Sequence, residues 1–197
     1  VNNAYGVLSS RAVHMINECV RLGGKLDLIV QSTDKNFMVL VGGSIIVSPL
    51  ASMVESVESI YPGRASSSQI IDLCATLLHF GEDGFKEILK ERKANFEYFK
   101  LRLEENSFSL IHTTHNDISM AVKVSEQSIG GTLFLKGVSG ARVVTPGQEK
   151  VIDGMSLKSF GTHHSDYATQ YLTVASAIGQ TKADIDYFVK ILLKCKN

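Results

Sequence analysis

Three short apolar runs near the start of the chain give the first structural prediction. They are residues Leu26–Val30, Phe37–Val41 and Ser44–Ser48. Branched and aromatic residues in runs this short are typical of buried strands. Gly42 and Gly43 separate the last two runs, and paired glycines between β-prone segments favour a tight hairpin. The pattern therefore predicts a strand followed by a hairpin in this stretch.

The segment before the first of these strands has a helical pattern. Its apolar residues recur at three- and four-residue spacing between the capping residue Ser9 and the pair Gly23-Gly24. Val1–Gly6 itself resembles a strand end, so the order is strand, helix, strand, with short connections. That order predicts a parallel βαβ unit and an α/β fold class.

The rest of the chain alternates helical and strand patterns. We expect helices at residues 49–60, 66–80, 81–106, around 132–134, 166–178 and 182–194, and strands at 110–113, 118–124 and from 142 onward. The composition changes near Gly81. We therefore expect a boundary between an α/β part, residues 1–80, and a smaller α+β part, residues 81–197.

The composition excludes several classes of protein. The 197 residues are 44% hydrophobic and 20% charged, which is typical of a globular chain. The formal net charge is zero, so overall charge gives no argument for nucleic-acid or membrane binding. Cys19, Cys74 and Cys195 form no close pair, which indicates reduced thiols. No apolar run reaches membrane-spanning length, and we expect no membrane segment. The chain starts at Val1 without methionine, so we expect it to be a piece of a longer protein.

Lys35 is the first candidate for chemistry. It follows the first predicted strand, between apolar runs, with Asp34 beside it. Partial burial of a lysine disfavours its charged form, and the neutral amine is the form that attacks a carbonyl. Asn2 and Asn3 end the preceding strand, and polar groups at the carboxyl ends of parallel strands meet in one crevice. The pattern favours a Schiff-base lysine, although a loop lysine paired with Asp34 fits it as well.

Arg64 is a candidate anion-binding residue. It is the exposed last residue of the predicted turn Tyr61–Arg64, whose proline and glycine suit type II geometry. Three serines able to cap a helix follow this turn. A guanidinium held between a rigid turn and a helix start suits a phosphate. An ordinary surface arginine is the alternative.

The histidines do not indicate a metal site. His163 and His164 are adjacent, so their side chains point apart, and neither they nor His112 and His115 have a carboxylate or cysteine at ligand spacing. We therefore expect no metal.

Four motifs carry a resemblance to a known family. In chain order they are VNNAYG, QSTDKNFMVLVGG, YPGRASSS and GVSGARVV. Together they resemble the O-phosphoseryl-tRNA(Sec) selenium transferase (soluble liver antigen) family, over nearly the whole chain. That family belongs to the fold-type-I enzymes that use pyridoxal 5′-phosphate (PLP). The resemblance implies that the chain is the C-terminal portion of such an enzyme, with residues 1–80 in the large PLP-binding domain and residues 81–197 as the small domain.

The resemblance also implies roles at the cofactor. Lys35 would form the Schiff base with PLP and later act as the base at the substrate's α-carbon. Asn2 and Asn3 stand where many of these enzymes have a strand whose aspartate bonds the pyridine nitrogen, with Asn2 at the aspartate's position. A neutral amide there would give a weaker electron sink than a carboxylate. The loop that binds the cofactor phosphate would lie in the missing N-terminal half.

Substrate, partners and location follow from the same resemblance. The enzyme would convert O-phosphoseryl-tRNA(Sec) to selenocysteinyl-tRNA(Sec), with selenophosphate as selenium donor, as a cytoplasmic homotetramer. Arg64 would hold the phosphate of the phosphoseryl group, and Arg21 and Arg142 would contact the acceptor end of the tRNA. Two alternatives remain: another PLP-dependent lyase or transferase on small amino acids, in which Arg64 would bind a carboxylate, and a non-catalytic tRNA-binding or assembly fragment.

Overall fold

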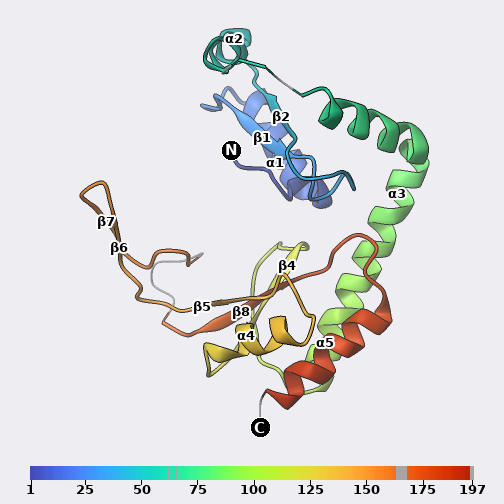
Figure 1. Cartoon of the computed structure of the whole chain (residues 1–197), viewed down its shortest axis with the longest axis vertical. Helices are drawn as coiled ribbons and strands as arrows, with labels where there is room; N and C mark the ends of the chain where they lie inside the picture. The colour runs from blue at the N-terminus through green and yellow to red at the C-terminus, as the bar shows by residue number, and fades with distance from the viewer. Residues whose placement is uncertain (62, 65, 163–167, 196–197) are drawn as a thin grey trace. The chain divides into compact units, whose positions relative to one another are not determined.

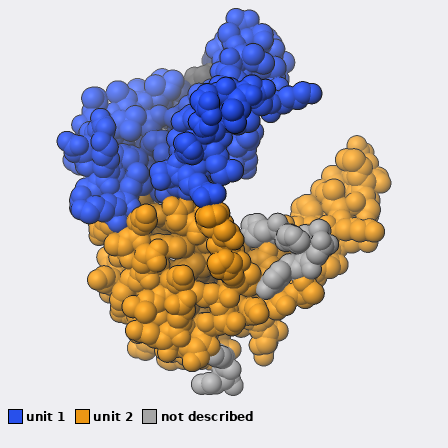
Figure 2. Space-filling model, turned by 180° about the vertical axis from the view of Figure 1, so that it is seen from behind, with its two compact units in different colours: residues 1–90 blue, residues 91–197 orange. Residues whose placement is uncertain are grey.

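The chain forms two compact units, which we call unit 1 (residues 1–90) and unit 2 (residues 91–197) (Figures 1 and 2). The structure, a computed structural model, describes residues 1–61, 63–64, 66–162 and 168–195. Helix α3 (Ser68–Glu105) is interrupted at Gly81, whose φ of 60° and ψ of −175° lie in a region open essentially only to glycine. The two helices predicted on either side of Gly81 are thus confirmed. The predicted domain boundary coincides with this interruption, ten residues before the division between units, and as a domain boundary it stays a prediction.

Unit 1 contains a two-stranded antiparallel sheet, but it is not the predicted hairpin. β1 (Ile29–Ser32) pairs directly with β2 (Ser44–Val47), with Ser32 opposite Ser44. The predicted strand at residues 37–41 is wrong. The chain turns immediately after β1, where the Phe37 amide bonds the Thr33 carbonyl at 3.2 Å, and Met38 takes a φ of 53° that extended backbone does not allow. Residues 33–43 therefore form a loop that returns the chain to the edge of β1.

The predicted parallel crossover is present at the other edge of β1. The Val30 amide bonds the Val1 carbonyl at 3.0 Å, and the Asn3 amide bonds the Val30 carbonyl at 2.8 Å, which makes a parallel bridge. Between them the chain passes through the 3-10 helix η1 (Gly6–Leu8) and helix α1 (Ser10–Arg21). Ser9 caps α1 as predicted, since its hydroxyl accepts from the Ala12 amide.

Two further helices complete unit 1. α2 (Ala51–Ile60) begins two residues after Pro49, close to its predicted start, and the first part of α3 follows it. The predicted turn at residues 61–64 includes Pro62, which lies outside the described residues, so its type is untested. Among the described residues, none of the helices has both the length and the apolar run that a membrane crossing requires.

Unit 2 is a four-stranded antiparallel sheet with helices packed on it. The strand order is β3–β4–β8–β5, and the helices are α4, α5 and the end of α3 (Figure 1). The bounds are β3 (Leu110–Ile111), β4 (Ser119–Lys123), α4 (Ser128–Leu135), β5 (Arg142–Val144), β8 (Tyr171–Ala175) and α5 (Lys182–Lys194). The core includes Phe99 and Leu103 of α3, Leu133 of α4, Leu172 of β8, and Ile185 and Leu192 of α5.

The predicted helix at residues 166–178 is wrong where the structure describes it. Residues 171–175 form β8, an inner strand that pairs with β4 on one side and β5 on the other. Leu172 and Val174 are buried on the helix-covered face. The sequence YLTVA is rich in β-prone residues, and pairing to two distant strands decides its conformation over the weak helical spacing. Residues 166 and 167 lie outside the described part.

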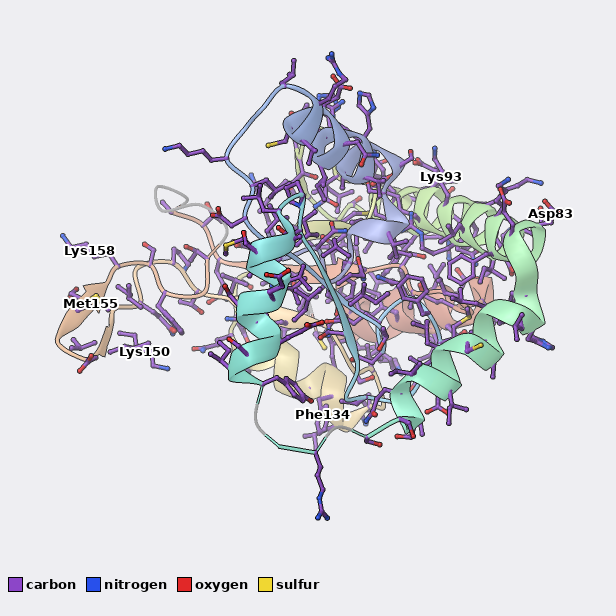
Figure 3. The ribbon with its side chains drawn as sticks, turned by 90° about the horizontal axis from the view of Figure 1, so that it is seen from above. Asp83, Lys93, Phe134, Lys150, Met155 and Lys158 are labelled. Carbon is purple, nitrogen blue, oxygen red and sulfur yellow. The ribbon has the colours of Figure 1, made fainter. Side chains whose placement is uncertain are left out.

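A second hairpin of unit 2 was not predicted. β6 (Lys150–Ile152) pairs antiparallel with β7 (Met155–Leu157), and every residue of both strands is exposed. Figure 3 shows Lys150, Met155 and Lys158 along this hairpin, away from the rest of unit 2. Its strands are three residues each, too short for the strand pattern to stand out in the sequence.

Candidate functional site

The turn after β1 places Lys35 beside three polar or aromatic groups. Its Nζ lies 3.2 Å from the Ser32 hydroxyl, 3.4 Å from Oδ2 of Asp34 and 5.9 Å from the centre of the Tyr5 ring. The Lys35 side chain is 31% exposed. The ammonium group thus contacts two polar side chains, and the side chain that carries it remains partly exposed. The ion pair with Asp34 is long and partly solvated, so it holds Lys35 only weakly.

A buried amide network lies beside Lys35. The Gln31 side chain accepts from Nδ2 of Asn3 at 3.1 Å and donates to the carbonyls of Ala4 and Ser32, both at 2.9 Å. Nδ2 of Asn36 also donates to the Ala4 carbonyl, at 3.2 Å. Gln31 and Asn36 are both buried. These two residues fix the chain on both sides of the lysine, and the sequence pattern did not single them out. The available signal was an amide side chain at the end of an apolar strand and a second one just after the lysine.

The two predicted asparagines have different environments. Asn3 is half-buried and its side chain reaches β1 through Gln31. Asn2 is exposed, and its Oδ1 accepts from the nearby Ala4 amide at 3.1 Å. The structure therefore connects Asn3 to the Lys35 loop, whereas the Asn2 side chain stabilises a local turn.

Thr33 and Gly43 close the base of the Lys35 loop. The Thr33 amide bonds the Gly43 carbonyl at 3.1 Å, and Thr33 is 3% exposed. A Cβ at Gly43 would lie 2.6 Å from the Thr33 hydroxyl and 3.1 Å from Cβ of Gln69. Glycine is required here for close approach. The buried Thr33 hydroxyl has no hydrogen-bond partner among the residues that the structure describes.

The two predicted arginines of unit 1, Arg21 and Arg64, make no bond to this network among the described residues. Arg21 ends α1 and binds Glu18 at 2.6 Å, and this hydrogen bond lowers the pKa of Glu18. Arg64 is exposed and makes no hydrogen bond or ion pair with any described residue. No bond between described residues joins Arg21 or Arg64 to Lys35.

Arg142 belongs to unit 2. It starts β5, and its carbonyl accepts from the Thr173 hydroxyl at 3.1 Å. A Cβ at Gly161 would lie 2.6 Å from its Nη2, so the guanidinium packs on that glycine.

Metal ligands are not gathered in the described part of the chain. No group of three or more His, Cys, Asp or Glu residues there could hold a metal ion. His163 and His164 lie outside the described residues.

Comparison with known sequences gives a match over the whole chain. A family model described as O-phosphoseryl-tRNA(Sec) selenium transferase, SepSecS, matches residues 1–197. The O-phosphoseryl-tRNA(Sec) selenium transferase of Dictyostelium discoideum is 39% identical, over 100% of this chain and 47% of its own length. That of Caenorhabditis elegans is 37% identical, over 94% of this chain and 41% of its own length. The chain thus spans less than half the length of these relatives.

Solved structures share the fold at lower identity. An archaeal O-phosphoseryl-tRNA(Sec) selenium transferase superposes with a TM-score of 0.80 at 22% identity, over 98% of this chain and 43% of its own. A serine palmitoyltransferase from S. paucimobilis, solved with a bound PLP–myriocin aldimine, superposes with a TM-score of 0.59 at 16% identity. The match covers 91% of this chain and 42% of the palmitoyltransferase. These likenesses confirm the predicted fold class, part of a fold-type-I α/β enzyme. The chain belongs to the O-phosphoseryl-tRNA(Sec) selenium transferase family.

Proposed function

We propose that this chain is the C-terminal portion of an enzyme that converts O-phosphoseryl-tRNA(Sec) to selenocysteinyl-tRNA(Sec), with selenophosphate as selenium donor. The observation that carries the proposal is the family match over residues 1–197, combined with a lysine held at the end of β1. The enzyme would be a cytoplasmic homotetramer, and residues 1–80 and 81–197 would belong to its large and small domains. The interruption of α3 at Gly81 supports that division.

The donor groups around Lys35 fit PLP. A primary amine is the group that bonds the aldehyde of PLP, and the amide of Asn3 suits its ring nitrogen. PLP supplies an electron sink that acidifies the hydrogen at the substrate's α-carbon. Asn2 is the second candidate for the ring nitrogen, although its exposed side chain bonds Ala4 in this structure. The cofactor phosphate would be held by the N-terminal half of the enzyme.

The residues near the cofactor have separable roles. Lys35 would take the proton from the α-carbon of the phosphoseryl group, and the Ser32 hydroxyl at 3.2 Å orients its amine. Asn3 would position the pyridine ring, with its own amide fixed by Gln31. Because Asn3 is a neutral amide, it does not hold a proton on the ring nitrogen as a carboxylate would. Phosphate is a good leaving group, and its loss tolerates a weaker electron sink.

The arginines would bind the anionic parts of the substrate. Arg64 would hold the phosphate that leaves, because its guanidinium is exposed and free of described partners. Arg21 and Arg142 would contact the acceptor end of the tRNA. Arg21 already pairs with Glu18, so a tRNA phosphate would have to share or replace that contact.

The test uses the complete protein that contains this chain, loaded with PLP. Borohydride reduction and peptide mapping should label Lys35, and Lys35→Arg should remove both the label and the transfer of selenium from selenophosphate to O-phosphoseryl-tRNA(Sec). Lys25→Arg, a change of an exposed lysine in the same unit, is the control and should affect neither. A pyridoxyl label on another lysine would refute the role of Lys35. Turnover of free O-phosphoserine in place of the tRNA-bound form would favour a PLP enzyme acting on small amino acids.

A further inference from the structure

Unit 2 has a basic hollow between α4 and α5. Its volume is about 630 Å³. Three lysines line it: Lys136 at the end of α4, and Lys190 and Lys194 on α5. The apolar part of its wall is formed by Ile129 and Ile191. Lys190 and Lys194 are four residues apart on one helix, so they project on the same side about one turn from each other. The remaining lining residues are Glu126, Ser128, Thr132, Tyr187 and Cys195.

Within the described residues, no ion pair neutralises the lysines of this hollow. Lys136, Lys190 and Lys194 are all exposed, and none of them forms an ion pair with a residue that the structure describes. Glu126 is the one acidic residue of the lining, and its carboxylate accepts a hydrogen bond from the Ser128 hydroxyl at 3.1 Å. Three lysines against one glutamate leave a local positive field in a chain whose formal net charge is zero.

A second hollow extends the basic surface. It measures about 320 Å³, shares Ile129 and Cys195 with the first, and adds Lys123 from the end of β4. The Tyr187 hydroxyl of α5 donates to the Lys136 carbonyl at 2.9 Å, which ties the end of α4 to α5. Four lysines from three elements are therefore held along two adjoining hollows by a common packed core.

The chemistry of the lining favours a chain of phosphates over one small molecule. Every charged or hydroxyl-bearing residue of the larger hollow is exposed, so no buried polar group is fixed for a specific small ligand. Lysines act as flexible point charges, and hydroxyl groups also commonly bond phosphates in nucleic-acid interfaces. Successive phosphates of a polyanion would meet several lysines at once and release their counterions.

We infer that the hollows between β4, α4 and α5 bind the sugar–phosphate backbone of RNA, through Lys123, Lys136, Lys190 and Lys194. This inference rests on the proposed function, in which the substrate is a tRNA, and it adds a backbone contact to the acceptor-end residues. The contact is electrostatic and independent of sequence, so it would position the RNA without selecting it.

The test compares two double variants of the complete protein. Binding of a labelled short RNA hairpin of arbitrary sequence is followed by fluorescence anisotropy over a range of salt concentrations. Lys190→Gln with Lys194→Gln should weaken binding by about fivefold or more and reduce the slope of log Kd against log salt by about 1–2. Circular dichroism checks that α5 remains folded.

The control removes the same charge at the same spacing elsewhere. Lys86→Gln with Lys90→Gln changes two exposed lysines of α3 that pair with Glu82 and Glu87. This control should change the hairpin affinity by less than about twofold. Equal losses in the two double variants, or no loss in the α5 variant, would overturn the inference.

Two further measurements separate the alternatives. If millimolar inorganic phosphate displaces the hairpin completely at constant ionic strength, the hollow is a small-phosphate site and the RNA inference is wrong. We expect no displacement beyond the effect of salt. Selenium transfer to O-phosphoseryl-tRNA(Sec) is assayed in parallel. Loss of hairpin binding in the α5 variant, without any selenium transfer by the unaltered protein, would support the RNA site but contradict the proposed function. Selenium transfer by the unaltered protein, with hairpin binding unchanged in the α5 variant, would support the proposed function but contradict the RNA site.

Discussion

Asn3 and Gln31, 28 residues apart in the chain, are joined by a hydrogen bond of 3.1 Å between their side-chain amides. Gln31 accepts this bond through Oε1 and donates from Nε2 to the carbonyls of Ala4 and Ser32, so it is bonded on both sides of the crossover. One buried amide thus links the segment proposed to face the cofactor ring to the strand that leads to Lys35. The positions of Lys35 and Asn3 therefore both depend on the Gln31 side chain.

Gln31→Leu should loosen the first segment from β1. The change leaves Asn3 Nδ2 and the Ser32 carbonyl without this partner, whereas the Ala4 carbonyl keeps its bond from Asn36. A buried unpaired group costs about 1–3 kcal/mol. Hydrogen exchange of the Asn3 and Val30 amides, which bond across this edge, reports the local loss of stability. Gln127→Leu alters an exposed glutamine without a side-chain cap bond and should leave these amides protected. Unchanged exchange at Asn3 in the Gln31 variant would show that the backbone bridge alone suffices.

Gly43→Ala should destabilise the base of the Lys35 loop, because the new Cβ would collide with the Thr33 hydroxyl. Overpacking of this kind typically costs about 1–3 kcal/mol. The exchange rate of the Thr33 amide, which bonds the Gly43 carbonyl, is the measurement. Adding Thr33→Ala should recover part of the loss, so the double variant should be more stable than the sum of the single changes by at least about 0.5 kcal/mol. If the free-energy changes of the two single variants simply added, the strain would lie at Gln69 and not at Thr33.

Local signals in the sequence were sufficient for several elements of the fold. The cap of α1 at Ser9 depends on a bond to an amide three residues away, and such bonds are encoded within one turn of chain. The interruption of α3 at Gly81 likewise follows from one residue type. The lysine after β1 was placed correctly at a strand end, although the strand lies a few residues later than predicted.

The wrong predictions concern which segments of the chain pair with each other. β2 pairs with β1 and not with residues 37–41, where Met38 has a φ of 53°. β8 is a strand because β4 lies beside it, some 50 residues earlier in the chain. No local pattern contains that partner. In the site, Gln31 and Asn36 were missed for the same reason, since their role appears only when Ala4 lies next to them.

Asp186 of α5 should make the packing of α5 on α3 sensitive to acid. Its carboxylate accepts from Nε of Arg102 at 2.7 Å and from the Tyr98 hydroxyl at 3.0 Å. The bond from Arg102 holds the pKa of Asp186 below its usual value of 3.8. A carboxylate whose pKa is lower in the folded state stabilises that state above the unfolded pKa, and the stabilisation disappears as the pH falls through the folded pKa. We expect the contact between α3 and α5 to weaken below a pH of about 3.8.

Thermal unfolding as a function of pH tests this expectation. The unaltered protein should lose melting temperature more steeply than Asp186→Asn between about pH 5 and pH 2, because the variant has no carboxylate to protonate at this position. Asp83→Asn, which alters an exposed carboxylate of α3, should keep the steep dependence. Parallel curves for the unaltered protein and Asp186→Asn would mean that solvent screens the contact with Arg102 too strongly for it to matter.

Substitutions of Arg64 and Arg142 should impair different steps if the proposed roles of these residues are right. Arg64→Ala removes a contact to the leaving phosphate, and a hydrogen bond to a charged group is worth about 1.5–3 kcal/mol, which corresponds to a fall in kcat/KM of about 10- to 150-fold. The absorbance of the bound cofactor should not change, because Arg64 makes no bond to Lys35 or Asn3. The measurement is selenium transfer by the complete enzyme, together with its absorption spectrum.

Arg142→Ala should instead weaken tRNA binding and reduce the salt dependence of log Kd by about 1, since one contact to the RNA is lost. Turnover at saturating tRNA should remain close to that of the unaltered enzyme, because Arg142 is proposed to bind the acceptor end and not the leaving group. Arg11→Ala, which changes an exposed arginine of α1, is the matched control for the loss of one charge. If Arg64→Ala and Arg142→Ala lowered turnover and tRNA affinity in the same proportion, both arginines would act on a common step and the division of roles would be wrong.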